Sequence, residues 1–361
     1  MIVDKHDSTP SSKSPKKTYK AVSLISGGLD SMLATKALLE QGVHVEGINF
    51  YTGFCVEGHT HAIRKKKQEH IKRNNALWVA EQLGIKLHIV DIVEEYKSVV
   101  INPKHGYGAN LNPCLDCKIF MVKKAYEWIK QHDFDFIITG EVIGQRPKSQ
   151  RLETMPVISE ESGAEDLLLR PMCAKNLPPT KPEREGWVDR EQLFDFSGRS
   201  RKPQIALANH WGIEEYSQPA GGCCFLTDPN YTVKLKDLWA NRGDKYYELD
   251  DIMLLKVGRH LRPRENFKMI IAREEGETRF LEGYKKQFSY IKTVSHGGPL
   301  TLLDGDLSED DWQLAASITA RFSQGRNEAA ITVAIGKKGQ APYETSIAPM
   351  AAEAIQQAWY L

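Results

Sequence analysis

Apolar and polar positions alternate in blocks of two kinds over the first 140 residues. Short apolar runs, such as KAVSLI from Lys20 and VHVEGINF from Val43, have the length and composition of strands buried on both faces. LHIVDI, from Leu87, and FDFIITG, which ends at Gly140, are two further predicted strands. Between the strands, helical spacing of apolar residues appears in MLATKALLEQ before Gly42 and over 62–84 and 117–131. This alternation predicts an α/β fold, a parallel sheet flanked by helices.

The pattern changes twice after the predicted sheet. A loop-rich stretch contains the breakers LPPTKP and QPAGG, and from about Asp250 short apolar runs surround an amphipathic helix, WQLAASITARFSQ. The second change predicts a smaller α/β domain at the C-terminus. We therefore expect four regions: a flexible tail over 1–17, a nucleotide-binding domain over 18–150, an extension over 151–248 and the small domain over 249–361.

Charge and composition limit the partners and the compartment. Lys and Arg total 48 against 47 Asp and Glu, so a polyanionic partner would have to be bound by local basic patches. Two candidates are IRKKKQEHIKR over 63–73 and GRSRKPQ over 198–204, although each is equally well explained as a solvated surface. No apolar run reaches the roughly 18 to 20 residues that cross a bilayer, so we expect a cytoplasmic protein without a membrane partner.

The strongest motif is SGGLDS, Ser26 to Ser31, between the first predicted strand and the first predicted helix. Gly27 and Gly28 leave the backbone N–H groups free to surround phosphate oxygens, and the serine hydroxyls and the helix N-terminus would add further attraction. Asp30 would repel a bare phosphate, so it is expected to bind Mg²⁺ or to fix the loop through hydrogen bonds. A plain turn remains the alternative interpretation.

SGGxDS after a first strand resembles the signature of the PP-loop ATP pyrophosphatases. The resemblance implies that ATP is cleaved between its α and β phosphates and that AMP is transferred to the substrate. It also implies that the ends of the second and fourth strands lie near the nucleotide, as expected for the carboxyl ends of parallel strands. The implied nucleotide-binding residues are Ser26, Gly27, Gly28, Leu29, Asp30, Ser31, Gly47, Ile48, Asn49 and Gly140.

Two pairs of cysteines indicate which nucleophile attacks the adenylate. NPCLDCK places Cys114 and Cys117 on one face at the start of a predicted helix, where the dipole stabilises thiolates, and GGCCF contains Cys223 and Cys224. The first segment resembles the bacterial tRNA 2-thiouridylases, apart from Lys118 and the GEVIGQRP stretch. This resemblance implies catalytic roles for Cys117 and for Cys223 or Cys224, of which we prefer Cys223, with Asp30 as the third catalytic residue.

Two sulfur chemistries are compatible with these cysteines. In one, Cys114, Cys117 and Cys223 hold a [4Fe–4S] cluster with an open iron, as in other tRNA-thiolating PP-loop enzymes; in the other, Cys117 and Cys223 pass on a persulfide. A structural zinc site and ordinary buried thiols are the alternatives. Cys55 and Cys173 are interpreted as structural, although Cys55 follows the second strand and could line the site.

The last 110 residues resemble the RNA-binding domain of NFACT-type ribosome quality-control proteins, through VGRHLRP, KMIIAREEGE, HGGPLTLLDG and AASITARFSQGR. The resemblance implies RNA contacts by five arginines: Arg259, Arg262, Arg264, Arg273 and Arg326. With less specificity, Arg146, Lys148 and Arg170 are candidates for phosphate contacts because they follow predicted strands.

The combined hypothesis is an ATP-dependent tRNA sulfurtransferase that adenylates a uridine carbonyl oxygen and replaces it with sulfur. A cysteine desulfurase, a sulfur carrier or hydrosulfide would be the sulfur donor. Three alternatives stay open: sulfur insertion into a small cofactor precursor, amidation, and a translation factor whose PP-loop domain is only structural.

Overall fold

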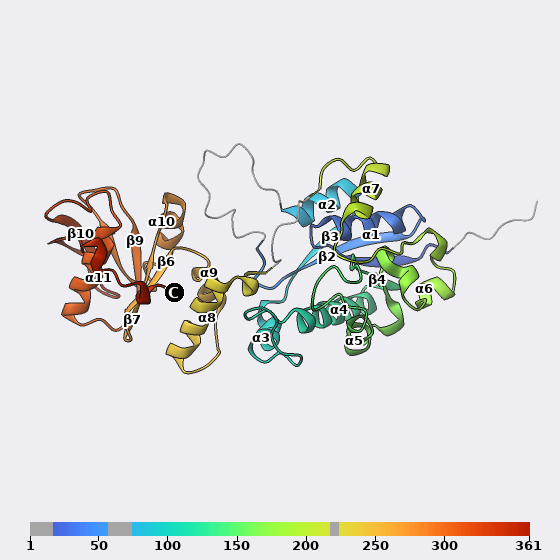
Figure 1. Ribbon diagram of the computed structural model, residues 1–361, viewed down its shortest axis with the longest axis horizontal. Coiled ribbons are helices and arrows are strands. Elements are labelled where there is room, and N and C mark those ends of the chain that lie inside the picture. Colours follow the sequence, from blue (N-terminus) through green and yellow to red (C-terminus); the bar gives the residue numbers. More distant parts are fainter. Residues whose placement is uncertain (1–16, 57–73, 217–223) are drawn as a thin grey trace, which may run out of the picture. The chain divides into compact units, whose positions relative to one another are not determined.

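A computed structural model describes residues 17–56, 74–216 and 224–361 of the chain (Figure 1). Three features of the sequence lie outside these residues: all but Lys17 of the predicted tail, the basic run over 63–73, and Cys223. In the described parts of the chain, no helix is both long enough and apolar enough to span a membrane.

The first sheet has five strands in the order β3-β2-β1-β4-β5. The printed pairings of β1 with β2 and β4, and of β4 with β5, are parallel. β1, β2, β3 and β4 coincide with the four predicted strands, whereas β5 is only two residues long and was not predicted. The bounds are β1 Lys20–Leu24, β2 His44–Tyr51, β3 Leu87–Asp91, β4 Phe136–Ile138 and β5 Leu168–Leu169.

Helices cover both faces of this sheet, as parallel strands with crossover connections require. α1 and α7 lie on one face, and α4 and α5 lie on the other (Figure 1). The side chains of β1 and β4 are accordingly buried almost throughout, which explains their continuous apolar runs. The helices are α1 Leu29–Leu39, α2 Asn75–Leu83, α3 Val93–Ile101, α4 Cys114–Gln131, α5 Thr154–Glu161, α6 Lys181–Arg184, α7 Lys202–His210, α8 Pro229–Arg242 and α9 Leu249–Leu254.

The second sheet has six strands in the order β11-β10-β8-β9-β7-β6, and all of its strand pairs are antiparallel. Trp312 and Ile318 of α11 pack with Leu261, Met269 and other apolar side chains of the strands in one core. The predicted fold class, a helix-flanked parallel sheet and a smaller C-terminal α/β domain, is confirmed. The bounds are β6 Arg259–Arg264, β7 Phe267–Ile271, α10 Glu275–Glu282, β8 Ser289–Thr293, β9 Leu300–Gly305, α11 Glu309–Arg321, β10 Ile331–Gly336 and β11 Tyr343–Ile347.

The described residues divide into two units by the density of their contacts. One unit contains residues 17–49, Val79–His88 and Met121–Tyr216, and the other contains the remaining described residues. The boundaries expected at residues 150 and 248 do not coincide with this division and stay predictions. The PP-loop motif falls in the first unit, whereas Cys114, Cys117 and Cys224 fall in the second, so the two sites are described separately.

Candidate functional sites

The SGGLDS loop turns directly from the first strand into helix α1. Gly27 has a φ of +76°, a left-handed conformation that favours glycine, and α1 begins two residues later at Leu29. The loop is closed by its own serines, because Ser31 Oγ donates to the Gly28 carbonyl oxygen at 2.9 Å and lies 3.3 Å from Ser26 Oγ. The N-terminus of α1 therefore opens at the carboxyl end of β1, where its unpaired N–H groups suit an anion.

Gly140, just beyond β4, packs against the backbone of this loop. A Cβ atom at this position would lie 2.4 Å from the Ser31 nitrogen and 2.6 Å from the Asp30 carbonyl oxygen. Real Cβ atoms essentially never approach other atoms that closely, so only glycine fits without moving the loop. The chain end of the neighbouring strand thus fixes the position of residues 30 and 31.

Asp30 is held by two residues that the sequence analysis did not assign to the site. Arg201 Nη2 donates to Asp30 Oδ2 at 2.9 Å, and Gln145 Nε2 donates to the same oxygen at 2.8 Å. The contacts form because residues 143 and 197 are bridged and the Gly198 nitrogen donates to the Ile143 carbonyl oxygen. The prediction that Asp30 fixes the loop by hydrogen bonds thus has a structural counterpart, with partners 115 and 171 residues away.

Several polar atoms around Asp30 have no hydrogen-bond partner within the described residues. These buried atoms are Asp30 Oδ1, Arg201 Nε and Gln145 Oε1. An orphaned carboxylate oxygen beside an orphaned guanidinium nitrogen suits a cation and an anionic group bound together. The donor set therefore fits a nucleotide with Mg²⁺, for which Asp30 is the available carboxylate.

The other predicted nucleotide residues lie at the end of β2. Gly47 is a close-packed position, since a Cβ would be 2.8 Å from Leu87 Cδ1 and 3.0 Å from Ile25 Cγ1. Ile48 is buried, and the Asn49 amide donates to the Ile25 carbonyl oxygen at 2.6 Å. Asn49 thus ties the end of β2 to the end of β1, and the adenine contact stays a prediction.

Arg170 and Cys173, which follow β5, are used inside the protein. Arg170 is 5% exposed, and its Nε lies 3.2 Å from Glu141 Oε2. A phosphate contact by this arginine is therefore not supported, because its charge neutralises a buried carboxylate. The Cys173 thiol donates to the Glu141 carbonyl oxygen, and burial raises its pKa to about 12. This thiol is protonated at neutral pH, as expected of a structural cysteine.

In the second unit, three thiols gather around the buried hydroxyl of Tyr96, in α3. Burial raises the pKa of Tyr96 well above its usual value, and the charges of Cys117 and Cys224, a hydrogen bond with the Cys117 thiol, and the charge of Cys55 raise it further. Cys114 and Cys117 themselves occupy the first turn of α4, where the helix dipole favours a thiolate. Cys55, interpreted from the sequence as structural, thus belongs to the same group as Cys117 and Cys224.

Cys55 and Cys224 are also paired through their backbones. They form an isolated antiparallel bridge, and the Phe225 nitrogen donates to the Phe54 carbonyl oxygen at 2.9 Å. A flanking hydrogen bond of this kind marks a non-hydrogen-bonded pair, in which Cα atoms are about 4.5 Å apart and side chains share one face. Both residues are free cysteines.

A buried lysine accompanies this pair. Lys256 Nζ donates to the Gly53 carbonyl oxygen and lies 4.9 Å from the centre of the Phe225 ring. Burial lowers the pKa of Lys256 to about 8, although the charges of Cys55 and Cys224 act in the opposite direction. No function was assigned to Lys256 from the sequence, because a lysine 30 residues from the nearest cysteine carries no local signal.

Comparison with known families agrees with both sites. Residues 17–176 match the family described as thiamine biosynthesis protein (ThiI), and residues 258–360 match the family described as NFACT protein RNA binding domain. The chain contains a ThiI-type PP-loop domain and an NFACT-type RNA-binding domain. Both resemblances inferred from the sequence motifs are thereby confirmed.

Individual relatives carry related names. A tRNA-specific 2-thiouridylase MnmA of Treponema denticola is 27% identical over 245 residues, covering 65% of this chain and 62% of the relative. A probable tRNA sulfurtransferase of Thermococcus kodakarensis is 27% identical over 179 residues, covering 49% of this chain and 40% of the relative. The chain thus spans less than two thirds of either relative.

Among solved structures, a 4-thiouridine synthetase–RNA complex with bound ATP is 22% identical, with a TM-score of 0.39. The match covers 58% of this chain and 45% of the other. A likeness of this strength carries no inference about function.

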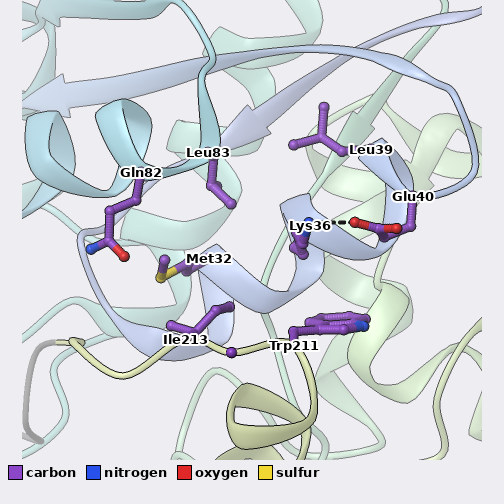
Figure 2. A pocket seen from close by; sticks show the side chains of 9 residues that line it. Met32, Lys36, Leu39, Glu40, Gln82, Leu83, Trp211 and Ile213 are labelled. Carbon is purple, nitrogen blue, oxygen red and sulfur yellow. Dashed lines mark ion pairs between the residues drawn. The ribbon is translucent and has the colours of Figure 1, made fainter.

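A hollow of about 350 Å³ lies on the ThiI-type domain, away from the loop (Figure 2). Trp211 and Ile213 line one side of it, and Lys36 and Glu40 of α1 form an ion pair on the other. The hollow includes neither Asp30 nor Gly140, so it is distinct from the nucleotide site proposed at the loop.

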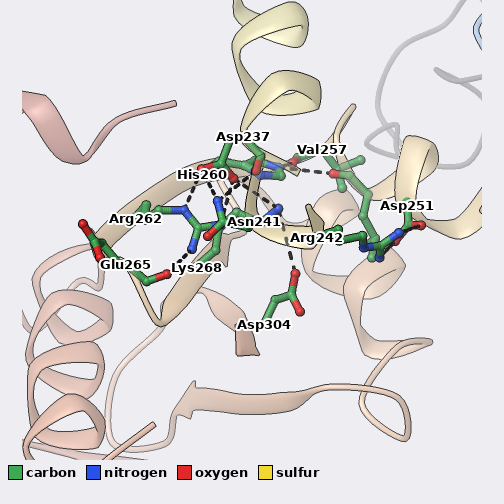
Figure 3. Close-up of polar contacts among 11 residues, drawn as sticks. Asp237, Asn241, Arg242, Asp251, Val257, His260, Arg262, Glu265, Lys268 and Asp304 are labelled. Atoms are coloured by element: carbon green, nitrogen blue, oxygen red, sulfur yellow. Dashed lines mark hydrogen bonds and ion pairs between the residues drawn. The ribbon is translucent and has the colours of Figure 1, made fainter. Parts of the chain in front are cut away.

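The NFACT-type domain uses several of its predicted RNA-contacting arginines internally. Arg262 donates to Asp237 (Figure 3), Arg264 to Asp311 and Arg273 to Glu277. Arg259 lies over the Phe322 ring, with its guanidinium carbon 4.3 Å from the ring centre. Arg326 is exposed. Of the five predicted arginines, Arg326 is therefore the strongest candidate for a phosphate contact.

The predicted iron–sulfur ligands are only partly described. Within residues 17–56, 74–216 and 224–361, no group of three or more His, Cys, Asp or Glu side chains could hold a metal ion. Cys114 and Cys117 share the first turn of α4, but the third predicted ligand, Cys223, lies outside these residues. The described donors alone do not make a cluster site.

Proposed function

We propose that this protein is an ATP-dependent tRNA sulfurtransferase, which adenylates a uridine carbonyl oxygen and replaces that oxygen with sulfur carried by its own cysteines. The observation that carries the proposal is the gathering of Cys55, Cys117 and Cys224 around Tyr96 in a chain with a ThiI-type domain. PP-loop domains alone do not distinguish thiolation from amidation, but amidation leaves several adjoining thiols without a role.

Adenylation is assigned to the SGGLDS loop. The backbone N–H groups at the start of α1 would bind phosphate oxygens, and Gly140 keeps residues 30 and 31 in place. Bound Mg²⁺ would neutralise phosphate charge, with Asp30 as its carboxylate ligand. Arg201, which is paired with Asp30, lies where its positive charge would stabilise the negative charge that develops as pyrophosphate leaves.

Sulfur transfer is assigned to the thiols of the second unit. In the persulfide route, Cys117 and a second cysteine from 223–224 carry and release the sulfur, and helix α4 stabilises the Cys117 thiolate. In the alternative route, Cys114, Cys117 and Cys223 hold a [4Fe–4S] cluster, which would supply an iron site for hydrosulfide. We derive no step through the cluster, because the described thiols do not form its ligand set.

Replacing Asp30 by Ala tests the adenylation half of the proposal. Pyrophosphate formation from ATP and unmodified tRNA should be lost, and thionucleosides should disappear from the tRNA of cells that contain only the variant. Glu165→Ala, outside the loop, is a matched removal of one carboxylate. Unchanged thionucleoside content in the Asp30→Ala cells would refute the catalytic assignment.

Anaerobic purification separates the two sulfur routes. A cluster predicts iron, acid-labile sulfide and absorbance near about 400 nm, all lost in Cys114→Ser. The persulfide route predicts an active, colourless, iron-free protein in which Cys114→Ser retains activity and Cys117→Ser does not.

A second candidate function follows from the description of the matched family, thiamine biosynthesis protein. A small cofactor precursor would then receive the sulfur in place of tRNA. This candidate predicts that pyrophosphate formation is independent of RNA, whereas the tRNA proposal predicts strong stimulation by unmodified tRNA and none by tRNA that is already thiolated.

A further inference from the structure

The pairing of Cys55 with Cys224 has the geometry of a disulfide site. The bridge places these residues opposite one another, and the about 4.5 Å typical of such Cα pairs falls within the roughly 4.4 to 6.8 Å that disulfides span. The flanking hydrogen bond from Phe225 to Phe54 holds the two backbones in register. Rotation of the side chains is therefore sufficient to join the sulfurs, without movement of the backbone.

The surroundings of both thiols are those of reacting groups and not of inert core cysteines. Neither residue is fully buried, in contrast to Cys173. Cys55 Sγ lies 3.5 Å from Thr52 Oγ1, and Cys224 Sγ accepts a hydrogen bond from the Leu226 nitrogen at 3.4 Å. Lys256 brings a basic group to the pair from another segment of the chain.

We propose that Cys55 is the resolving thiol of the sulfur-transfer cycle, which releases sulfur from a persulfide on Cys224 by forming a Cys55–Cys224 disulfide. This inference rests on the proposed function and extends it to a residue outside the CxxC and GGCC motifs. It also selects Cys224, rather than Cys223, as the sulfur carrier of the persulfide route.

The step balances in atoms and electrons. The Cys55 thiolate attacks Cys224 Sγ, the bond between Cys224 Sγ and the outer sulfur breaks, and the outer sulfur leaves as hydrosulfide with the bonding electron pair. The Cys55 proton goes to Lys256 in its neutral form. The hydrosulfide displaces AMP from the adenylated carbon, and an external dithiol then reduces the Cys55–Cys224 disulfide to two thiols.

The roles of the remaining groups follow from their contacts. Lys256 is a positioning and proton-accepting residue, since it contacts the thiols and no predicted substrate atom. Cys117 comes from helix α4 and is hydrogen-bonded to Tyr96, so its sulfur is not part of the backbone-registered pair. A disulfide between Cys117 and Cys224 is the competing product that an experiment must distinguish.

The experiment uses the full-length protein, treated with sodium polysulfide to load persulfides. Hydrosulfide release without reductant is measured with monobromobimane, and linked cysteines are identified by peptide mass spectrometry after alkylation of free thiols. Cys55→Ser is compared with wild type and with the matched control Cys173→Ser, whose hydroxyl would donate to the same carbonyl oxygen as the native thiol.

We expect a Cys55–Cys224 linked peptide in the wild type and in the Cys173 control. Release by Cys55→Ser should be at least about tenfold slower and should recover with dithiothreitol, which supplies the missing thiol. A linkage from Cys117 to Cys224 or Cys223 in the wild type, or undiminished release by Cys55→Ser, would overturn the inference. The wild-type mapping does not depend on how well any variant folds.

Pyrophosphate formation by the wild type is measured in parallel with ATP and unmodified tRNA. If no pyrophosphate forms while the Cys55–Cys224 linkage is found, the proposed function fails and the resolving pair stands. If pyrophosphate forms but the linkage is absent, the resolving role of Cys55 fails alone.

Discussion

Adding one methyl group at Gly140 should disable the nucleotide loop while leaving the fold intact. The new Cβ would lie 2.4 Å from the Ser31 nitrogen and 2.5 Å from the Asp30 carbonyl carbon. These atoms must separate by about 0.6 Å to reach 3.0 Å and by about 1.0 Å to reach an ordinary contact of 3.4 Å. Because the neighbours are backbone atoms at the start of α1, the loop itself has to move.

A displacement of this size is large for catalysis and moderate for stability. Misplacing reacting groups by about 1 Å costs on the order of 100-fold in rate, whereas overpacking costs about 1 to 3 kcal/mol of stability. We therefore expect Gly140→Ala to remain folded by circular dichroism and to form pyrophosphate from ATP and tRNA roughly 100-fold more slowly.

Gly283→Ala is the matched control for this prediction. Gly283 has a φ of −61°, and a Cβ there would meet only the Phe280 carbonyl oxygen, at 3.4 Å. This variant should form pyrophosphate at the wild-type rate. If Gly140→Ala is folded and equally fast, the close approach between Gly140 and the loop has no catalytic consequence and the site assignment is wrong.

Three further predictions concern charged side chains. Arg201→Ala should slow pyrophosphate formation by about tenfold or more, since hydrogen bonds to charged groups contribute roughly 1.5 to 3 kcal/mol, and an unchanged rate would remove Arg201 from the site. Burial lowers the pKa of His260 well below 6.5, so the unfolded chain binds the extra proton; stability should fall below about pH 6.5 by up to about 1.4 kcal/mol per pH unit in urea titrations, and His260→Gln should lose this slope. Lys256→Met should slow iodoacetamide alkylation of Cys55 and Cys224 at pH 8 by roughly tenfold, with Cys114 as internal reference, and equal rates would exclude an electrostatic role for the lysine.

The nucleotide loop illustrates what could be read from the sequence. SGGLDS between an apolar strand and a helix is a local arrangement, and its geometry follows from neighbouring residues, glycine freedom and the helix N-terminus. The four buried strands were predictable for the same reason, because each is a continuous apolar run. β5 was missed because two residues are too few to give a period.

The partners of the loop and of the thiols were decided only by tertiary structure. Arg201 stands in a basic run that suggested an RNA patch, yet the contact between residues 143 and 197 brings it to Asp30. Cys55 looked like an isolated thiol until a backbone bridge paired it with Cys224, across 169 intervening positions. The sequence by itself determined the fold class, the loop and the CxxC segment, whose geometry is local. Only the folded chain decided which charges and thiols meet, because contacts between distant segments depend on strand order and loop packing, which leave no periodic trace in the sequence.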